Sequence, residues 1–438
     1  MKQLGDDYVA PEFRQHLLKN GIRLHVQTTR KFKTTTVNLF LHQNLNNENA
    51  TRDALLSYIL RRGSETAPTT QILAQKLEEL YGASLRTDVF KMGERHLLSL
   101  RLDLVGERFL VQPDGLLRRG LDLFQDVLTR PVTEKGVFRQ DYLDQEKDTL
   151  RRTIEGLIND KGQYALTRCV EEMCRGEPYA TFRYGRREDI EPISAADLFR
   201  YYQGLLQANP IDVFVVGDLD FQTAADLLEE TLRFPREGGR EIPAGAAEKE
   251  VTEVKRVMDR EDVNQGKLIL GYRTNIPYSD PDLFGLVVYN GILGAFPHSK
   301  LFLNVREKAS LAYYAVSRLE TTKGLLFISS GIESSNYQRA LDIIEEQVAD
   351  MAAGRISQEE YDNTQKALIS QLKEEEDSPG RRILSYLEGL INDRPLSTEE
   401  EIRGIIGVTR EDVIRVAGRI KPDTIYFLNS SQRVGEMR

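Results

Sequence analysis

Hydrophobic positions in this chain repeat with two different periods, and the two periods alternate along the sequence. Short runs rich in β-branched and aromatic residues predict strands in the first half at 22–28, 35–42, 84–90, 96–104 and 211–216. Stripes of apolar residues at helical spacing predict helices at 54–60, 70–81, 115–129, 134–175 without a break, 195–205 and 222–232. Thr51 and Asp53 are the N-cap candidates of the first helix. The mixture predicts an α+β domain.

The same order of elements returns in the second half, after a Gly- and Pro-rich stretch at 235–247. Strands are predicted at 252–258, 267–273, 311–317 and 424–428, and helices at 280–293, 299–306, 337–351, 357–392 and 410–417. Ser84 and Ser310 open matching segments and lie 226 positions apart (310 − 84 = 226), about half the chain. We therefore predict two similar α+β domains from an internal duplication, each a mostly antiparallel sheet packed with helices. The expected limits are 1–234 for the first domain, 235–249 for the linker and 250–438 for the second domain.

Composition narrows the classes of partner and location. At 438 residues the chain is too long for a single hydrophobic core, which agrees with two domains. The net charge of −9 (59 basic minus 68 acidic residues) argues against a nucleic-acid or anionic-membrane partner. No apolar run reaches membrane-spanning length, and the first 13 residues contain no apolar signal core. We expect a cytoplasmic location.

Histidine and cysteine spacing gives no local metal motif. Neither HExxH nor its inverted form H-x-x-E-H occurs among the five histidines, which are His16, His25, His42, His96 and His298. Three of them lie in predicted strands, where we expect structural roles with satisfied hydrogen bonds. Cys169 and Cys174, five apart in a predicted helix, lie on different helix faces, which favours neither a disulfide nor a metal site.

One candidate binding pair stands in the stretch 299–314, SKLFLNVREKASLAYY. A helix ending near Arg306 is predicted to turn into a strand that carries Tyr313, seven residues later (313 − 306 = 7). A guanidinium and a phenol on one wall could together donate hydrogen bonds to a peptide carbonyl or carboxylate. The alternative is that Arg306 forms a surface ion pair and Tyr313 is an ordinary strand residue.

Several ordered segments resemble one known family. Residues 290–313, NGILGAFPHSKLFLNVREKASLAY, are similar to the "LGG…S-x-L-F-x-x-V-R-E-K-x-G-L-A-Y" stretch of the insulinase/pitrilysin zinc peptidases, which include mitochondrial processing peptidase. Gly63-Ser64 with Pro68-Thr69 resembles the "K-G-T…R-P-T" stretch of the first domain in that family, and 216–218 resembles a strand end of the same domain. The resemblance covers essentially the whole chain. Gly294 departs from the usual Gly-Gly pair, and we expect it to serve as packing or hinge.

The resemblance also exposes a missing zinc site. In active members the helix before "K-G-T" carries H-x-x-E-H, but the matching positions here are Ala54, Ser57 and Tyr58. The remaining zinc ligand of the family, a Glu seven residues after another Glu, falls on Thr153 (146 + 7) when Glu146 is matched to the first. None of these side chains is a good zinc ligand or base near neutral pH. We therefore expect no catalytic residue and no bound metal in this chain.

The family's substrate-binding Arg and Tyr, by contrast, match at Arg306 and Tyr313, with Tyr314 as the alternative if the strand register shifts by one. The resemblance implies a non-catalytic, substrate-binding subunit of a heterodimeric, processing-peptidase-like zinc metallopeptidase, inactive alone. A homologous partner would supply zinc and H-x-x-E-H, and peptide would be the substrate. The alternative hypothesis is a scaffold or peptide-binding homo-oligomer without peptidase activity.

Overall fold

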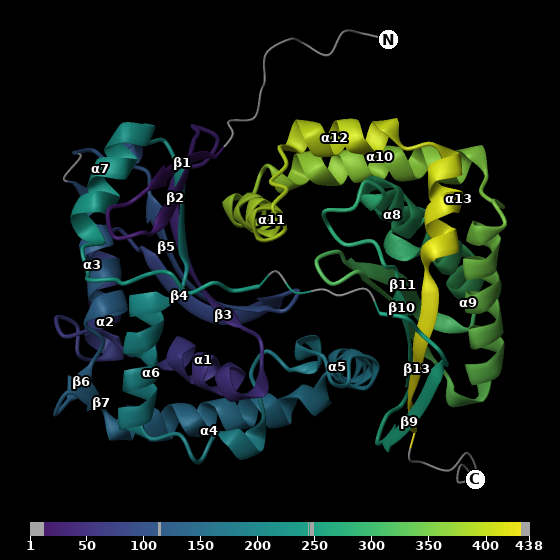
Figure 1. Cartoon of the computed structure of the whole chain (residues 1–438), viewed down its shortest axis with the longest axis horizontal. Coiled ribbons are helices and arrows are strands. Elements are labelled where there is room, and N and C mark those ends of the chain that lie inside the picture. The colour runs from purple at the N-terminus through teal and green to yellow at the C-terminus, as the bar shows by residue number, and fades with distance from the viewer. Residues whose placement is uncertain (1–12, 113–114, 244, 246–248, 431–438) are drawn as a thin grey trace, which may run out of the picture. The chain divides into compact units, whose positions relative to one another are not determined.

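The chain folds into two compact units, each built from one sheet and its own set of helices (Figure 1). The computed structural model describes residues 13–112, 115–243, 245 and 249–430. One unit comprises 1–155 with 181–243, and the other comprises 156–180 with 244–438. Segment 156–180 therefore belongs to the second unit, although in sequence it lies within the range expected for the first domain. In the expected linker, residues 244 and 246–248 lie outside the described residues, as does most of the N-terminal stretch searched for a signal.

The sheet of the first unit has six strands in the order β1-β2-β8-β3-β5-β4. The strands are β1 (Arg14–Leu17), β2 (Arg23–Thr28), β3 (Thr34–Asn44), β4 (Ser84–Met92), β5 (Arg95–Val105) and β8 (Ile211–Gly217). Only the β2–β8 pair among these is parallel. The helices are α1 (Asn47–Leu60), α2 (Thr70–Glu79), α3 (Leu116–Thr129), α4 (Gln140–Gly156), α6 (Ala195–Ala208) and α7 (Phe221–Thr231).

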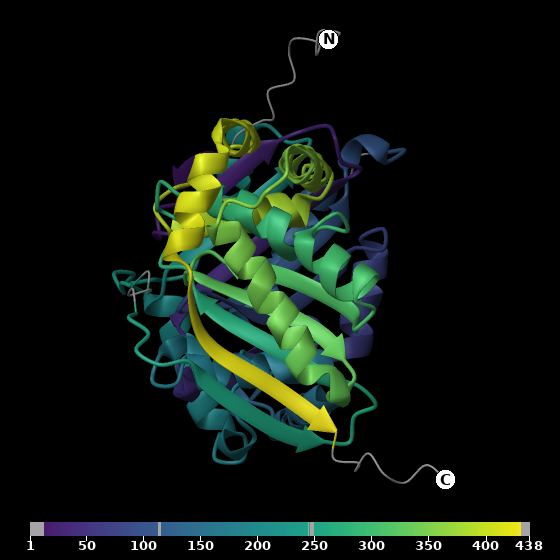
Figure 2. The same ribbon diagram turned by 90° about the vertical axis from the view of Figure 1, so that its right-hand side faces the viewer.

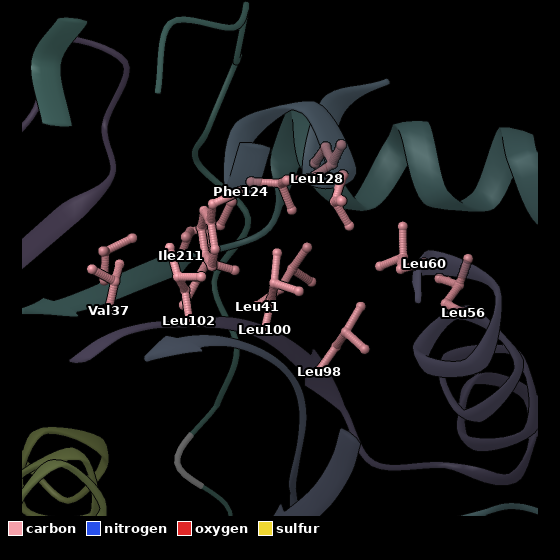
Figure 3. Close-up of a cluster of buried hydrophobic side chains, with 14 of the residues drawn as sticks. Val37, Leu41, Leu56, Leu60, Leu98, Leu100, Leu102, Phe124, Leu128 and Ile211 are labelled. Atoms are coloured by element: carbon pink, nitrogen blue, oxygen red, sulfur yellow. The ribbon is translucent and has the colours of Figure 1, made fainter. Parts of the chain in front are cut away.

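One face of this sheet carries the apolar core of the first unit (Figure 3). Alternate residues of the strands point to one side, so leucine, valine and isoleucine from β2, β3, β4, β5 and β8 meet the helices there. Leu98, Leu100 and Leu102 of β5 lie beside Phe124 of α3 and Leu56 of α1 in this cluster. Burying one such side chain contributes about 1.5–3 kcal/mol, so the core fixes α1 and α3 against the sheet.

The sheet of the second unit has five strands in the order β11-β12-β10-β13-β9. They are β9 (Lys255–Glu261), β10 (Gly266–Arg273), β11 (Ala312–Glu320), β12 (Leu325–Ile332) and β13 (Lys421–Ser430), with only β9–β13 parallel. The helices are α5 (Lys161–Met173), α8 (Leu283–Asn290), α9 (Tyr337–Ala352), α10 (Gln358–Glu375), α11 (Pro379–Ile391), α12 (Thr398–Gly407) and α13 (Arg410–Arg419). Figure 2 looks onto the face that α9 covers, with β13 in yellow along it. Helix α5 covers the opposite face.

The two sheets share one topology, which confirms two similar α+β units. Read from its parallel pair, the first sheet runs β2-β8-β3-β5-β4 and the second runs β9-β13-β10-β12-β11. In both orders the strand latest in sequence lies between the first two strands of the shared set, with β8 between β2 and β3 and β13 between β9 and β10. The matching segments that begin at Ser84 and near Ser310 become β4 and β11, each at a sheet edge.

Three helix predictions were wrong in detail, each for a local reason. The range predicted as one helix over 134–175 begins instead with a hairpin of β6 (Thr133–Glu134) and β7 (Val137–Phe138), and the helix that follows is broken where Asp160 caps α5. The predicted helix over 357–392 divides where Ser378 caps α11 and Pro379 opens it. The N-cap of α1 is Asn46, not Thr51 or Asp53, because its side chain accepts the Asn49 N–H. Within the described residues, no helix is both long enough and apolar enough to span a membrane.

Candidate functional site

The positions that resemble a zinc site lie on α1 and α4 and are filled by non-ligating side chains. Ala54 and Ser57 are fully buried in α1, and the Ser57 hydroxyl donates to the Ala54 carbonyl at 2.8 Å. The Tyr58 hydroxyl lies 3.3 Å from Thr153 Oγ1 of α4, so the structure does bring these two positions together. A hydroxyl-to-hydroxyl bond now stands where the resemblance places two zinc ligands.

The charge around these hydroxyls also disfavours a cation. The Arg61 guanidinium lies over the Tyr58 ring, 4.5 Å from its centroid. Glu146, which matches the first Glu of the family segment, is buried and bonded to Arg62 Nε, with Arg61 Nη2 at 3.9 Å. Two arginines therefore already neutralise the Glu146 carboxylate. The described residues contain no group of three or more His, Cys, Asp or Glu side chains suited to a metal ion.

The buried histidines of the first unit are structural, as predicted. The Asp212 carboxylate lies between His25 Nε2 at 2.7 Å and His42 Nε2 at 2.8 Å. His96 Nδ1 bonds to Asp53 at 2.7 Å. Burial lowers the pKa of His42, which keeps that ring neutral near pH 7. Each ring is thus tied to a carboxylate of its own unit.

Arg306 lies in the π-helical turn Phe302–Lys308 that follows α8 and the first π-helical turn, Gly291–Ala295. Its guanidinium packs over the Phe302 ring at 4.5 Å and its Nε is 3.5 Å from Glu307 Oε1. The side chain remains 43% exposed. At Gly294 an added Cβ would lie 2.6 Å from the Ser317 nitrogen, so the expected packing role of that glycine is confirmed.

The two tyrosines at the start of β11 occupy different environments. Ser310 at φ +53° ends the turn, and the register of β11 against β12 shifts between Ala312 and Tyr314, leaving Tyr313 in a bulge. Tyr313 is 76% exposed. Tyr314 packs its ring against Gly331, where an added Cβ would lie 2.7 Å from the ring. The contacts of Arg306 are to Phe302 and Glu307, so its pairing with Tyr313 stays a prediction.

Sequence reasoning missed a polar cavity of about 900 Å³ in the second unit. The break before α5 and the connection between β9 and β10 line it, with Lys267 at its side. The signal was present as Asn159-Asp160-Lys161-Gly162, a capping sequence inside a helix predicted as continuous.

Comparison with known proteins agrees with the geometry. Residues 192–368 match the family model described as Peptidase M16 inactive domain. The probable inactive metalloprotease YmfF of Bacillus subtilis (strain 168) is 38% identical over 413 residues, which cover 94% of this chain and 96% of that protein. The antilisterial bacteriocin subtilosin biosynthesis protein AlbE of Bacillus subtilis is 23% identical over 284 residues, 63% of this chain and 68% of its own length.

Solved structures show the same fold. A conserved protein from Enterococcus faecalis V583 has a TM-score of 0.87 and 31% identity, covering 96% of this chain and 99% of its own. The peptidase M16 inactive domain from Pseudomonas fluorescens has a TM-score of 0.77 at 19% identity, covering 96% and 98%, and is similar in fold alone.

Proposed function

The chain belongs to the M16 (insulinase/pitrilysin) peptidase family as a homologue without the zinc motif, and on this premise we propose that it is the peptide-binding subunit of a two-chain zinc peptidase. Its partner would be a homologous chain that carries H-x-x-E-H and holds the zinc. The family relationship supports this proposal because a two-chain enzyme of this family can divide its tasks. One chain can hold the zinc, and a homologue without the zinc motif can bind the substrate.

The observation that carries the proposal is the pair of exposed polar side chains at and just before the start of β11. Arg306 and Tyr313 are exposed, and Tyr313 sits in a bulge of an edge strand. An edge strand presents backbone donors and acceptors with which an extended peptide can pair. A guanidinium and a phenol next to that edge would hold a peptide carbonyl and stabilise the negative charge that develops on it during cleavage.

The test is turnover by the reconstituted pair. With the H-x-x-E-H partner present, Arg306→Ala should lower the rate on the order of 10²–10³-fold, the usual effect of removing one oxyanion donor. Lys308→Ala is the matched control, because Lys308 is a cation in the same π-helical turn and its Nζ donates to Asn304 Oδ1 at 3.0 Å. Size-exclusion chromatography should show that both variants still assemble.

Unchanged turnover in Arg306→Ala would remove the role assigned to that side chain. Purification from the native host without a second M16 chain, as a homo-oligomer that binds peptide, would instead support the alternative hypothesis of a peptide-binding homo-oligomer.

A further inference from the structure

The cavity of the second unit lies where α5 begins and where β9 turns into β10. Its lining comes from 159–162, from 262–265 and from Lys267, all within one compact unit. Two lysines and two aspartates line it, so the formal charges balance, and the side-chain amides of Asn159, Asn264 and Gln265 add both donors and acceptors. At about 900 Å³ it is large enough to admit the end of a peptide or a short loop of one.

Lys267 is the cation best placed to receive a ligand. Its ammonium lies 5.5 Å from the centre of the Tyr314 ring, and burial lowers its pKa. Within the described residues no carboxylate approaches its Nζ as an ion pair; Asp160 acts on it only at longer range. The Asp160 side chain caps α5, because its Oδ1 accepts the Gln163 N–H at 3.0 Å. Lys267 therefore keeps its donors while losing part of its hydration.

Tyr314 brings a second donor to the rim. Its ring packs against Gly331, and its hydroxyl lies 3.7 Å from the position that a Cβ on Gly162 would take. Since Gly162 lines the cavity, the phenol reaches the cavity wall near the start of α5. Burial raises the pKa of Tyr314, so the phenol stays protonated and can donate.

We propose that this cavity binds a carboxylate group of a peptide, with Lys267 as its charged partner and the Tyr314 hydroxyl as a second donor. The inference rests on the proposed peptide-binding function and names the group that the chain recognises. A carboxylate carries a single charge, which suits a cavity whose own aspartates would repel a doubly charged phosphate. The C-terminus of a peptide and an acidic side chain within it share this chemistry, and the experiment separates them.

The experiment measures binding of one short peptide sequence in three forms by calorimetry. The peptide is acetylated at its N-terminus, and its parent sequence has no charged side chain. It is prepared as the free acid and as the carboxamide. The third form is the carboxamide with one internal residue replaced by glutamate. The intact protein should bind the free acid or the glutamate form about tenfold or more tightly than the neutral form, because a charge-assisted hydrogen bond is lost in the latter. Preference for the free acid identifies the C-terminus, and preference for the glutamate form identifies a side chain.

Three variants assign the effect to the cavity. Lys267→Met should abolish the preference, Tyr314→Phe should reduce it severalfold, and Lys267→Arg should keep it because the charge is retained. Lys373→Met is the control, since Lys373 is an exposed lysine of α10 in the same unit. Circular dichroism establishes that each variant is folded.

Equal affinity of the intact protein for all three forms would overturn the carboxylate site while leaving peptide binding in place. A preference that survives Lys267→Met would likewise overturn it. If no form binds, the proposed peptide-binding function fails first, and this inference fails with it.

Discussion

The carboxyl group of Glu401 on α12 offers a quantitative test of the packing in the second unit. Burial, together with the neighbouring carboxylates of Glu375 and Glu388, raises the pKa of Glu401 to about 7 from an ordinary value of 4.5. Arg382 and a 3.5 Å hydrogen bond from Ser385 Oγ act in the opposite direction without cancelling the effect. The fold thus holds this group in its neutral form more tightly than the unfolded chain does.

The sign of the pH dependence follows from that difference. Because the folded pKa lies above the unfolded one, the stabilisation is fully present below pH 4.5 and is lost as the pH rises through about 7. A difference of 2.5 pKa units (7 − 4.5) is at most about 3 kcal/mol at 1.36 kcal/mol per unit. Glu401→Gln keeps the shape and removes the titration, so the variant should be more stable than the natural chain at pH 8. At pH 4.5 the two should be nearly equal.

Thermal unfolding followed at pH 4.5 and pH 8 checks this expectation. For a unit of about this size, 1 kcal/mol shifts the midpoint by roughly 2–4 °C, so the variant should gain up to about 6–12 °C at pH 8. Glu374→Gln is the control, because Glu374 is an exposed carboxylate of α10. If Glu401→Gln is no more stable than the natural chain at pH 8, or gains equally at both pH values, the raised pKa assigned to Glu401 is refuted.

Two further substitutions test the backbone and the core of the second unit. Ser310→Gly should raise the free energy of unfolding by about 0.5–1 kcal/mol in urea denaturation, because Ser310 holds φ at +53°, a region that glycine occupies without penalty; a loss of stability would contradict this. Arg273→Met should cost about 3–5 kcal/mol, since buried Arg273 pairs with Glu177 Oε1 at 2.6 Å and Asp423 Oδ2 at 2.9 Å and its loss leaves both carboxylates without that partner. An unchanged unfolding midpoint in differential scanning calorimetry would show that these pairs are dispensable.

Local patterns predicted most elements of the fold, and the resemblance predicted the family, which the comparisons confirm. The period of the hydrophobic positions located most strands of both sheets because those strands have a face in a core, but it missed β1, whose four residues are all exposed. The pattern did not reveal that 156–180 joins the second unit, since a stripe on α5 says that a face is buried but not against which sheet. The pairing of His25 and His42 with Asp212 was equally invisible, because strands far apart in the sequence bring the three side chains together.

Breaks in helices were the other source of error, and one of them concealed the cavity. Asp160 competes with helix continuation by accepting a backbone N–H from the residue three positions on. The sequence pattern on both sides of it is helical, so periodicity alone joins α4 to α5. Recognising Asp160 as a cap would have predicted a helix start and a polar break at 159–162, although not that this break lies beside Lys267.

The contrast between the two sets of family positions bears on what this chain has kept. Tyr58, Thr153 and Glu146 are all engaged within the first unit, so the side chains in the region that resembles a zinc site are held by contacts of the fold. Arg306 rests on one ring and one neighbouring carboxylate and is substantially exposed, so truncating it should change stability by less than about 0.5 kcal/mol. If Arg306→Ala leaves the stability unchanged but lowers turnover of the proposed pair on the order of 10²–10³-fold, Arg306 serves the substrate and not the fold. A loss of stability comparable to the loss of turnover would instead assign Arg306 to the fold.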